Sequence, residues 1–195
     1  MRLLFPTVFH EISIKNFKSI KRELIDFVYD QRQRDSAGVE CSNIGGWQSQ
    51  DVYHQGDNII RSTVLKTIQP YFKKILRNGG EVELANMWLN INKKGDYNST
   101  HNHPRSHLSG VLWIKTPNHS GHFEMQSPHA FECGHEIGAY NDTFQEKTGS
   151  YDYYYLLPTE GNIVIFPSYL NHKVKPNESD EDRISVAFNL WSIVR

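Results

Sequence analysis

The sequence contains few of the features that mark secreted, membrane or nucleic-acid-binding proteins. Its 195 residues include two cysteines, Cys41 and Cys133, which are too few for a disulfide framework and favour a reducing compartment. No apolar run approaches the roughly 18 residues that cross a bilayer, and the apolar start of the chain is too short for a signal peptide. We therefore expect a soluble, cytoplasmic protein with no membrane partner.

Charge and repeats are also scarce. The formal net charge is -1 and no long basic run is present, so nothing in the charge pattern favours a nucleic-acid partner. We find no internal repeat, no low-complexity segment and no linker long enough to divide the chain. The length and the 38% content of hydrophobic residues predict a single domain over residues 1–195 with a substantial core.

Apolar residues recur at helical spacing in the first 80 residues. Asn16 is a candidate cap for a helix that begins at Phe17, and a second helix is expected from about Asn58 to Arg77. The predicted apolar stripe of the second helix consists of Ile60, Val64, Ile68, Phe72 and Ile75. Residues 36–56 are polar and glycine-rich, which predicts a loop anchored by Trp47.

After Gly80 the apolar pattern changes to a period of two, which is typical of strands. We expect strands over 81–91, 108–115, 121–125, 151–157, 161–166, 172–175 and 184–194, and irregular structure over 127–150. Many short antiparallel strands after two helices predict a mostly β fold with flanking helices, namely a double-stranded β-helix (jelly roll). In this arrangement residues 1–80 support a β-helix core over residues 81–195.

Three of the ten histidines have a spacing that suits a metal site. His101 and His103 lie two residues apart, so they share one face of an extended strand, and we expect the pair to begin that strand. His172 follows about 70 residues later, where a jelly roll returns to the same mouth. The pattern predicts a metal with open coordination positions, although an isolated His-x-His also occurs by chance.

An arginine follows the third histidine. Arg183 opens the apolar strand 184–188, and a guanidinium is costly to bury unless it holds an anion such as a carboxylate. The alternative is a salt bridge to the acidic turn at residues 180–182.

Together these segments resemble a known family. Residues 101–111 (HNHPRSHLSGV), 166–177 (FPSYLNHKVKPN) and 182–189 (DRISVAFN) are similar to the 2-oxoglutarate- and Fe(II)-dependent oxygenases that occur as small single-domain proteins in bacteria and phages. The resemblance covers roughly residues 82–194, and more weakly residues 46–49. It extends more distantly to enzymes of the prolyl-hydroxylase type.

The resemblance implies a dioxygenase, namely a hydroxylase, that uses Fe(II), dioxygen and 2-oxoglutarate and releases succinate and carbon dioxide. It implies that His101, His103 and His172 are the metal ligands. Arg183 would bind the far carboxylate of 2-oxoglutarate, and Ser185, on the same face of its strand, would add a hydrogen bond. The resemblance leaves the main substrate open, as a small molecule or a protein side chain.

His103 departs from the family pattern, in which a carboxylate stands at this place. Asp96 and Glu124 are alternative sources of the carboxylate, and a further alternative makes His103 the first ligand while His101 only lines the pocket. Three neutral histidines also suit zinc, so a zinc-dependent hydrolase or lyase is the alternative enzyme. A non-enzymatic cupin-like binding protein is the third hypothesis.

Several other residues are weaker candidates. Asn90 and Trp88 alternate on one strand and could face the cosubstrate, whereas Trp113 is expected in the core and His107 near the site or on the surface. Cys133-Gly134-His135 is a poor metal site because it lacks a partner pair. The tyrosine run 151–155 fits ordinary β-packing, with a substrate wall or the edge of a homodimer as alternatives.

Overall fold

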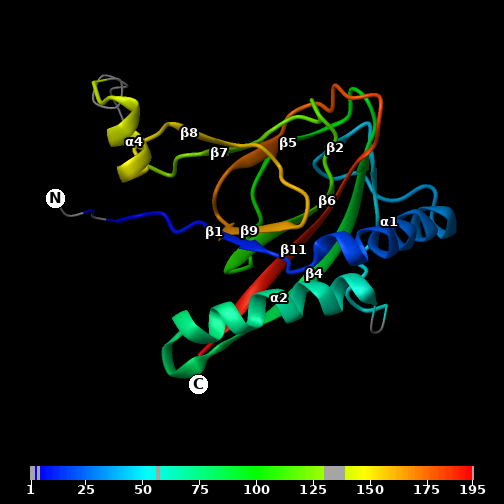
Figure 1. Cartoon of the computed structure of the whole chain (residues 1–195), viewed down its shortest axis with the longest axis horizontal. Coiled ribbons are helices and arrows are strands. Elements are labelled where there is room, and N and C mark those ends of the chain that lie inside the picture. Colours follow the sequence, from blue (N-terminus) through cyan, green and yellow to red (C-terminus); the bar gives the residue numbers. More distant parts are fainter. Residues whose placement is uncertain (1–2, 4, 56–57, 130–138, 195) are drawn as a thin grey trace.

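The computed structural model describes residue 3 and residues 5–55, 58–129 and 139–194. Its main helices are α1 (Phe17–Arg34) and α2 (Ile59–Ile75); a 3-10 turn, η1 (Arg77–Gly79), and the short helix α4 (Asp142–Thr148) complete the helical elements described (Figure 1). In this part of the chain no helix combines the length and the apolar character needed to span a membrane.

The strands form two antiparallel sheets. The larger sheet has the order β1-β9-β6-β11-β4-β3 and the smaller has the order β2-β5-β10-β7-β8. The larger sheet contains β1 (His10–Ser13), β3 (Trp47–Gln48), β4 (Glu81–Asn92), β6 (Leu108–Lys115), β9 (Asn162–Pro167) and β11 (Arg183–Ile193). The smaller contains β2 (Asn43–Ile44), β5 (Tyr97–His101), β7 (Phe123–Gln126), β8 (Tyr153–Leu156) and β10 (His172–Val174).

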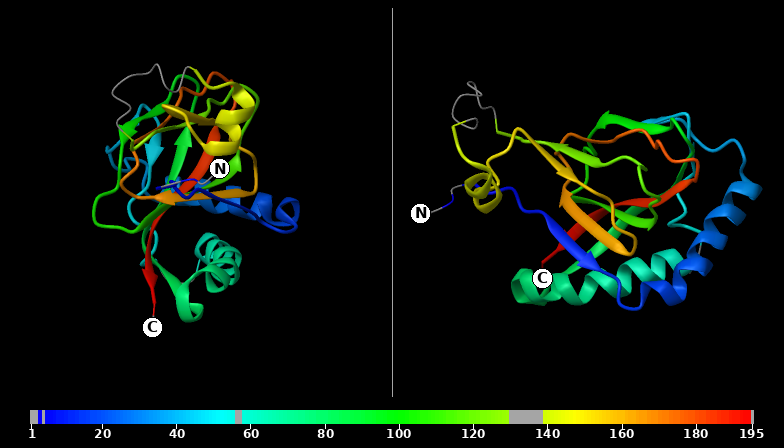
Figure 2. Two further views of the ribbon diagram at one scale, coloured as in Figure 1. Left: turned by 90° about the vertical axis from the view of Figure 1, so that its left-hand side faces the viewer. Right: turned by 45° about the horizontal axis from the view of Figure 1, so that its top comes forward.

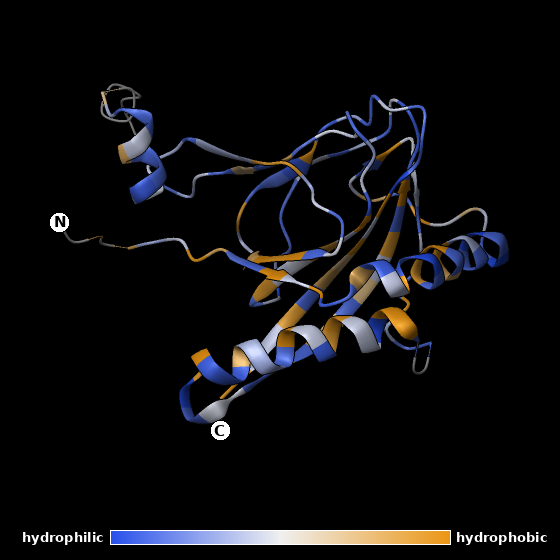
Figure 3. Cartoon of the chain, in the orientation of Figure 1, coloured by the Kyte–Doolittle hydropathy of each residue, from blue (hydrophilic) through white to orange (hydrophobic). Residues whose placement is uncertain are grey.

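The two long helices cover the outer face of the larger sheet (Figure 2). Ile60, Val64, Ile68 and Phe72 of α2 are buried as predicted, while Ile75 at its end is 51% exposed. They pack with α1 and with alternate residues of the strands in one apolar cluster, and the hydrophobic residues of α2 are seen on the ribbon in Figure 3. This layer is the predicted helical support, and it leaves the other face of the sheet for the site.

A second apolar cluster fills the space between the sheets. It comprises Val111, Trp113, Phe123, Met125, Val164, Phe166, Leu170 and Val174. Side chains from both sheets meet there, as the pleat requires when two sheets face one another. The two facing sheets with helices on one side correspond to the predicted jelly roll.

The structure differs from the sequence predictions at several element ends. The Asn16 side chain makes no capping hydrogen bond; the residue has φ 57° instead, whereas Asn58 caps α2 by accepting from the backbone N–H of Arg61 at 2.7 Å. Residues 36–56 contain the two-residue strands β2 and β3, and the segment expected to be irregular contains α4. Strand β5 was not predicted, because its sequence lacks apolar alternation.

Candidate metal and cosubstrate site

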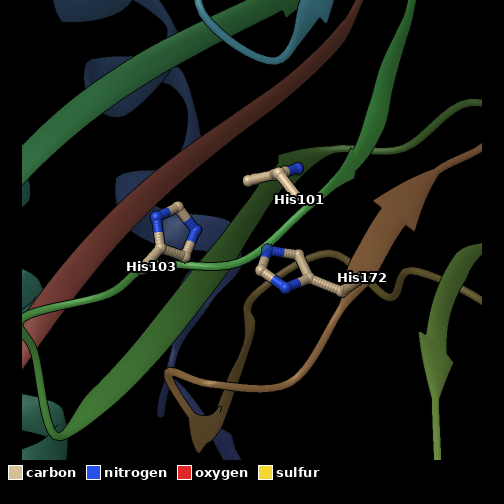
Figure 4. Close-up of side chains that lie close together, drawn as sticks. All are labelled: His101, His103 and His172. Carbon is tan, nitrogen blue, oxygen red and sulfur yellow. The ribbon is translucent and has the colours of Figure 1, made fainter.

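The three predicted histidines converge between the sheets from two neighbouring strands and a loop (Figure 4). His172 begins β10 and lies directly opposite His101, the last residue of β5. His103 follows β5 in a loop, where its backbone N–H donates to the carbonyl oxygen of Ser168 at 2.9 Å. The expectation that His101 and His103 begin a strand was therefore wrong: the chain leaves β5 after His101.

The three imidazoles are close enough to share one ion. One ligand nitrogen from each lies within 4.8 Å of the others, and the ring centroids of His101 and His172 are 4.3 Å apart. Nδ1 of His101 lies 2.7 Å from the carbonyl oxygen of Ser99, and Nδ1 of His172 lies 2.9 Å from that of Leu170. These contacts suit an N–H at Nδ1 and leave Nε2 of both rings to bind a metal.

Burial keeps the three rings in the form that binds metals. Desolvation, with a smaller contribution from neighbouring histidines, lowers the pKa of His172 to about 3 and that of His103 to about 4. Desolvation also lowers the pKa of His101, against the opposing effect of its bond to the Ser99 carbonyl. At neutral pH all three are neutral imidazoles, so no proton has to leave before a cation binds.

Arg183 is buried between the sheets, with 1% of its surface exposed. Its Nη1 donates to the carbonyl oxygens of Ser120 and, at 2.8 Å, Lys175. Its Nε and Nη2 are buried with no hydrogen-bond partner among the described residues. Burial lowers the pKa of Arg183 to about 10 against the opposing effect of the Asp96 charge, so the guanidinium remains a cation at neutral pH, and it forms no ion pair within the described residues.

The alternative salt bridge from Arg183 to the acidic turn does not form. Asp180 contacts Lys94 at 2.7 Å and Glu181 contacts Lys115 at 2.9 Å. Asp182 accepts a hydrogen bond from the Tyr29 hydroxyl at 2.7 Å.

A row of polar side chains crosses the inner face of the larger sheet beside Arg183. Gln48, Asn90, Ser185 and Trp113 occupy directly paired positions on β3, β4, β11 and β6. Paired residues project from the same face of a sheet, and all four are at least 90% buried. Gln48 Oε1, Asn90 Oδ1 and Trp113 Nε1 lack a partner in the described part of the structure. The structure thus brings Asn90 and Ser185 to the same face as Arg183.

The two alternative carboxylates lie outside the histidine cluster. Glu124 contacts Lys173 at 2.6 Å, His122 at 3.4 Å and Lys175 at 3.5 Å; its neighbours in β7, Phe123 and Met125, point into the core instead. Asp96 accepts a hydrogen bond from the backbone N–H of Lys93 at 2.7 Å and so closes the turn before β5. Neither carboxylate is grouped with the histidines among the described residues.

The remaining candidates fall in different places. His107 is exposed and lies 2.9 Å from the Ser192 hydroxyl, while Trp88 lies beside His103 with ring centroids 5.4 Å apart. Cys133-Gly134-His135 lies outside the described residues.

Tyr153, Tyr154 and Tyr155 of β8 are 40–59% exposed rather than packed in the core. With Phe5 and Phe9 they line a groove that also includes Met125, the residue opposite His172.

Sequence reasoning missed a bridge of amide side chains at the site. Asn102, between the two histidines, donates to Oδ1 of Asn171 at 2.9 Å, and Nδ2 of Asn171 donates to Gln126 at 3.3 Å. The bridge joins the loop that carries His103 to the residue before His172. Its members are far apart in the sequence and carry no motif that would reveal the contact.

Comparison with known proteins places the chain in a family. A family model described as "Putative 2OG-Fe(II) oxygenase", where 2OG is 2-oxoglutarate, matches residues 86–189, which is more than half of the sequence. The chain belongs to this 2OG-Fe(II) oxygenase family. The protein is therefore an oxidoreductase whose cofactor is Fe(II) and whose cosubstrates are 2-oxoglutarate and dioxygen. The matched residues include all three histidines and Arg183. No curated protein sequence matches the chain.

Solved structures confirm the fold of this oxygenase. A prolyl-4-hydroxylase from Pseudomonas putida aligns with a TM-score of 0.64 and 14% identity, over 95% of this chain and 92% of the other. The alpha ketoglutarate dependent carbocyclase SnoK from nogalamycin biosynthesis aligns with a TM-score of 0.67 and 12% identity, over 94% of this chain and 79% of the other. A Trichoplax adhaerens prolyl hydroxylase, in complex with a peptide fragment, aligns with a TM-score of 0.64 and 11% identity, over 94% of this chain and 83% of the other. At these identities the likeness establishes the double-stranded β-helix and no substrate.

Proposed function

We propose that His101, His103 and His172 hold the Fe(II) of this oxygenase and that Arg183, with Ser185 and Asn90, binds 2-oxoglutarate. The observation that carries the proposal is the convergence of three neutral imidazoles on the same interior as a fully buried guanidinium with two unpartnered N–H groups. Three protein ligands leave open positions on an octahedral ion, as a chelating cosubstrate and dioxygen require.

The residues of the site have separable tasks. The Ser99 and Leu170 carbonyls hold the rings of His101 and His172, and the amide bridge holds the loop of His103. Arg183 supplies the positive charge that fixes the far end of 2-oxoglutarate and so sets which end reaches the metal. Fe(II), when bound, would activate dioxygen, so that one oxygen atom enters succinate as 2-oxoglutarate loses carbon dioxide and the other hydroxylates the main substrate.

The interior excludes water around these groups. The rings of Phe166 and Phe123 lie beside His172, with centroids 4.8 Å and 5.6 Å away, and both phenylalanines are fully buried. An apolar wall limits unproductive reaction with solvent and strengthens the attraction between Arg183 and a carboxylate.

A zinc-dependent hydrolase on the same histidines is the alternative that Arg183 argues against. Such an enzyme has no need for a buried guanidinium beside the metal, whereas a dicarboxylate cosubstrate does. Within the proposal the third ligand is His103 rather than Asp96 or Glu124, because both carboxylates are engaged elsewhere. We also propose that residues 1–195 act as one cytoplasmic domain; a homodimer remains a prediction.

Anaerobic titration tests the proposal. Fe(II) followed by 2-oxoglutarate should give a weak visible charge-transfer band in the wild-type protein and in His107→Ala, which removes an exposed histidine outside the cluster. His172→Ala should lose the band. A wild-type protein that binds Fe(II) but shows neither the band nor affinity for 2-oxoglutarate would overturn the proposal.

A further inference from the structure

Trp113 of β6 has a buried polar group that nothing in the described structure satisfies. The residue is 1% exposed and lies in the apolar cluster between the sheets, yet its indole Nε1–H has no hydrogen-bond partner. Buried tryptophans usually find a partner for this group, and leaving it unpaired is costly. An unpaired donor of this kind, inside a ligand-binding interior, indicates an acceptor that arrives with the ligand.

The pairing of β6 with β11 shows which ligand group the indole can reach. Trp113 lies directly opposite Ser185, and Arg183 precedes Ser185 by two residues and projects from the same face. The β6–β11 register shifts between Ile184 and Ser185, so Arg183 and Trp113 are neighbours on this face across an irregular step of the ladder, at a separation that long side chains span. Nε and Nη2 of Arg183 are unpartnered like the indole N–H. Three buried donors thus belong to one corner of the site.

In the described structure these donors are not hydrogen-bonded to any acceptor. Gln48, Asn90 and Asn92 have buried carboxamide oxygens on the same face, but none is hydrogen-bonded to the indole or to the guanidinium. A carboxylate has about four lone-pair positions, so it can accept two N–H bonds from Arg183 and still accept the indole N–H and the Ser185 hydroxyl.

We propose that Trp113 Nε1–H donates a hydrogen bond to the carboxylate that Arg183 binds, the one remote from the metal in 2-oxoglutarate. The inference rests on the proposed function and adds to Arg183 and Ser185 a further donor that determines cosubstrate choice. A corner lined by donors selects a terminal carboxylate over a methyl group or a neutral ester. From the usual contribution of a hydrogen bond to a charged group, we expect loss of the bond from Trp113 to weaken 2-oxoglutarate binding about tenfold or more.

Nuclear magnetic resonance of the indole N–H groups provides the test. The sequence has four tryptophans, and in ¹⁵N-tryptophan-labelled, Zn(II)-loaded protein Trp113→Phe assigns the signal of Trp113. Addition of 2-oxoglutarate should move this signal downfield. The signal of Trp47, whose indole already donates to the Asp35 carbonyl at 2.8 Å, should stay in place. 2-Oxobutyrate, which lacks the far carboxylate, should leave the Trp113 signal unchanged.

Affinity measurements separate the inference from the function it extends. Trp113→Phe keeps the ring in the core but removes the N–H, and it should weaken 2-oxoglutarate binding about tenfold or more. Trp191→Phe, at an exposed position of β11, should have no effect.

Wild-type protein that fails to bind 2-oxoglutarate defeats the proposed function. Wild-type protein that binds it while the Trp113 signal stays fixed defeats only the inference, as does an indole already hydrogen-bonded to trapped water before addition. The wild-type titration decides even where Trp113→Phe folds poorly.

Discussion

Replacing Arg183 by methionine should remove the affinity for 2-oxoglutarate while leaving the affinity for metal intact. Methionine fills a similar length of the interior without the charge, so the change avoids a large cavity. Nη1 of Arg183 is occupied by the carbonyls of Ser120 and Lys175, which leaves Nε and Nη2 for the cosubstrate. Hydrogen bonds to a charged group contribute about 1.5–3 kcal/mol, which corresponds to about a 10–150-fold rise in the dissociation constant.

The assay is anaerobic calorimetry of the Fe(II)-loaded protein with 2-oxoglutarate, alongside a separate metal titration. Arg77→Met, at an exposed turn, is the matched control, and Arg183→Lys should fall between wild type and methionine because it keeps the charge without the paired donors. Thermal denaturation checks the fold, since the freed carbonyls of Ser120 and Lys175 lower stability. Unchanged 2-oxoglutarate affinity in a folded Arg183→Met protein would refute the assignment of Arg183.

Three further perturbations test the neighbouring structure. His103→Ala should weaken metal binding at least about tenfold, whereas His103→Asp, which restores a carboxylate, should retain metal binding. Metal titrations in which wild type and His103→Ala bind equally well would exclude His103 as a ligand. Asn102→Ala should weaken metal binding roughly 2–10-fold by breaking the bridge to Asn171, and Asn118→Ala, in a surface turn, should not. Desolvation raises the pKa of Glu124, but contacts with Lys173, Lys175 and His122 together outweigh it and lower the pKa from its usual value of about 4.5. The charge of Glu124 therefore stabilises the fold above this value, and the stability is lost as the pH falls. In urea denaturation at pH 7, the free energy of unfolding of Glu124→Gln should therefore be lower than that of wild type by roughly 1.5–3 kcal/mol. The difference should shrink towards pH 3, and a difference that persists there would contradict the ionic origin.

The sequence predicted the parts of the fold that carry strong apolar periodicity. The stripe of α2 and the long strands β4, β6 and β11 were expected near their observed positions because each buries a face against a core. Strand β5 was not expected, because Tyr97-Asn98-Ser99-Thr100-His101 has no apolar alternation. Pairing with β10 rather than local preference makes this segment extended.

The candidate site was predicted in its residue types but not in its contacts. His101, His103, His172 and Arg183 were visible from spacing and from the resemblance to the oxygenase family. The orientation of the rings by backbone carbonyls, the bridge from Asn102 to Asn171 and the unpaired indole of Trp113 depend on which strands are neighbours. Spacing along a chain does not contain that information, because sheet order in a jelly roll is not the order of the sequence.

The pairing of His101 with His172 has a consequence for how the chain folds. These two residues are the ends of a loop of about 70 residues, and closing such a loop costs conformational entropy before its contacts form. A metal ion bound to both histidines acts as a reversible cross-link at the base of the loop. Chelation should therefore loosen the centre of the smaller sheet while the helical layer on the larger sheet, which packs elsewhere, stays folded.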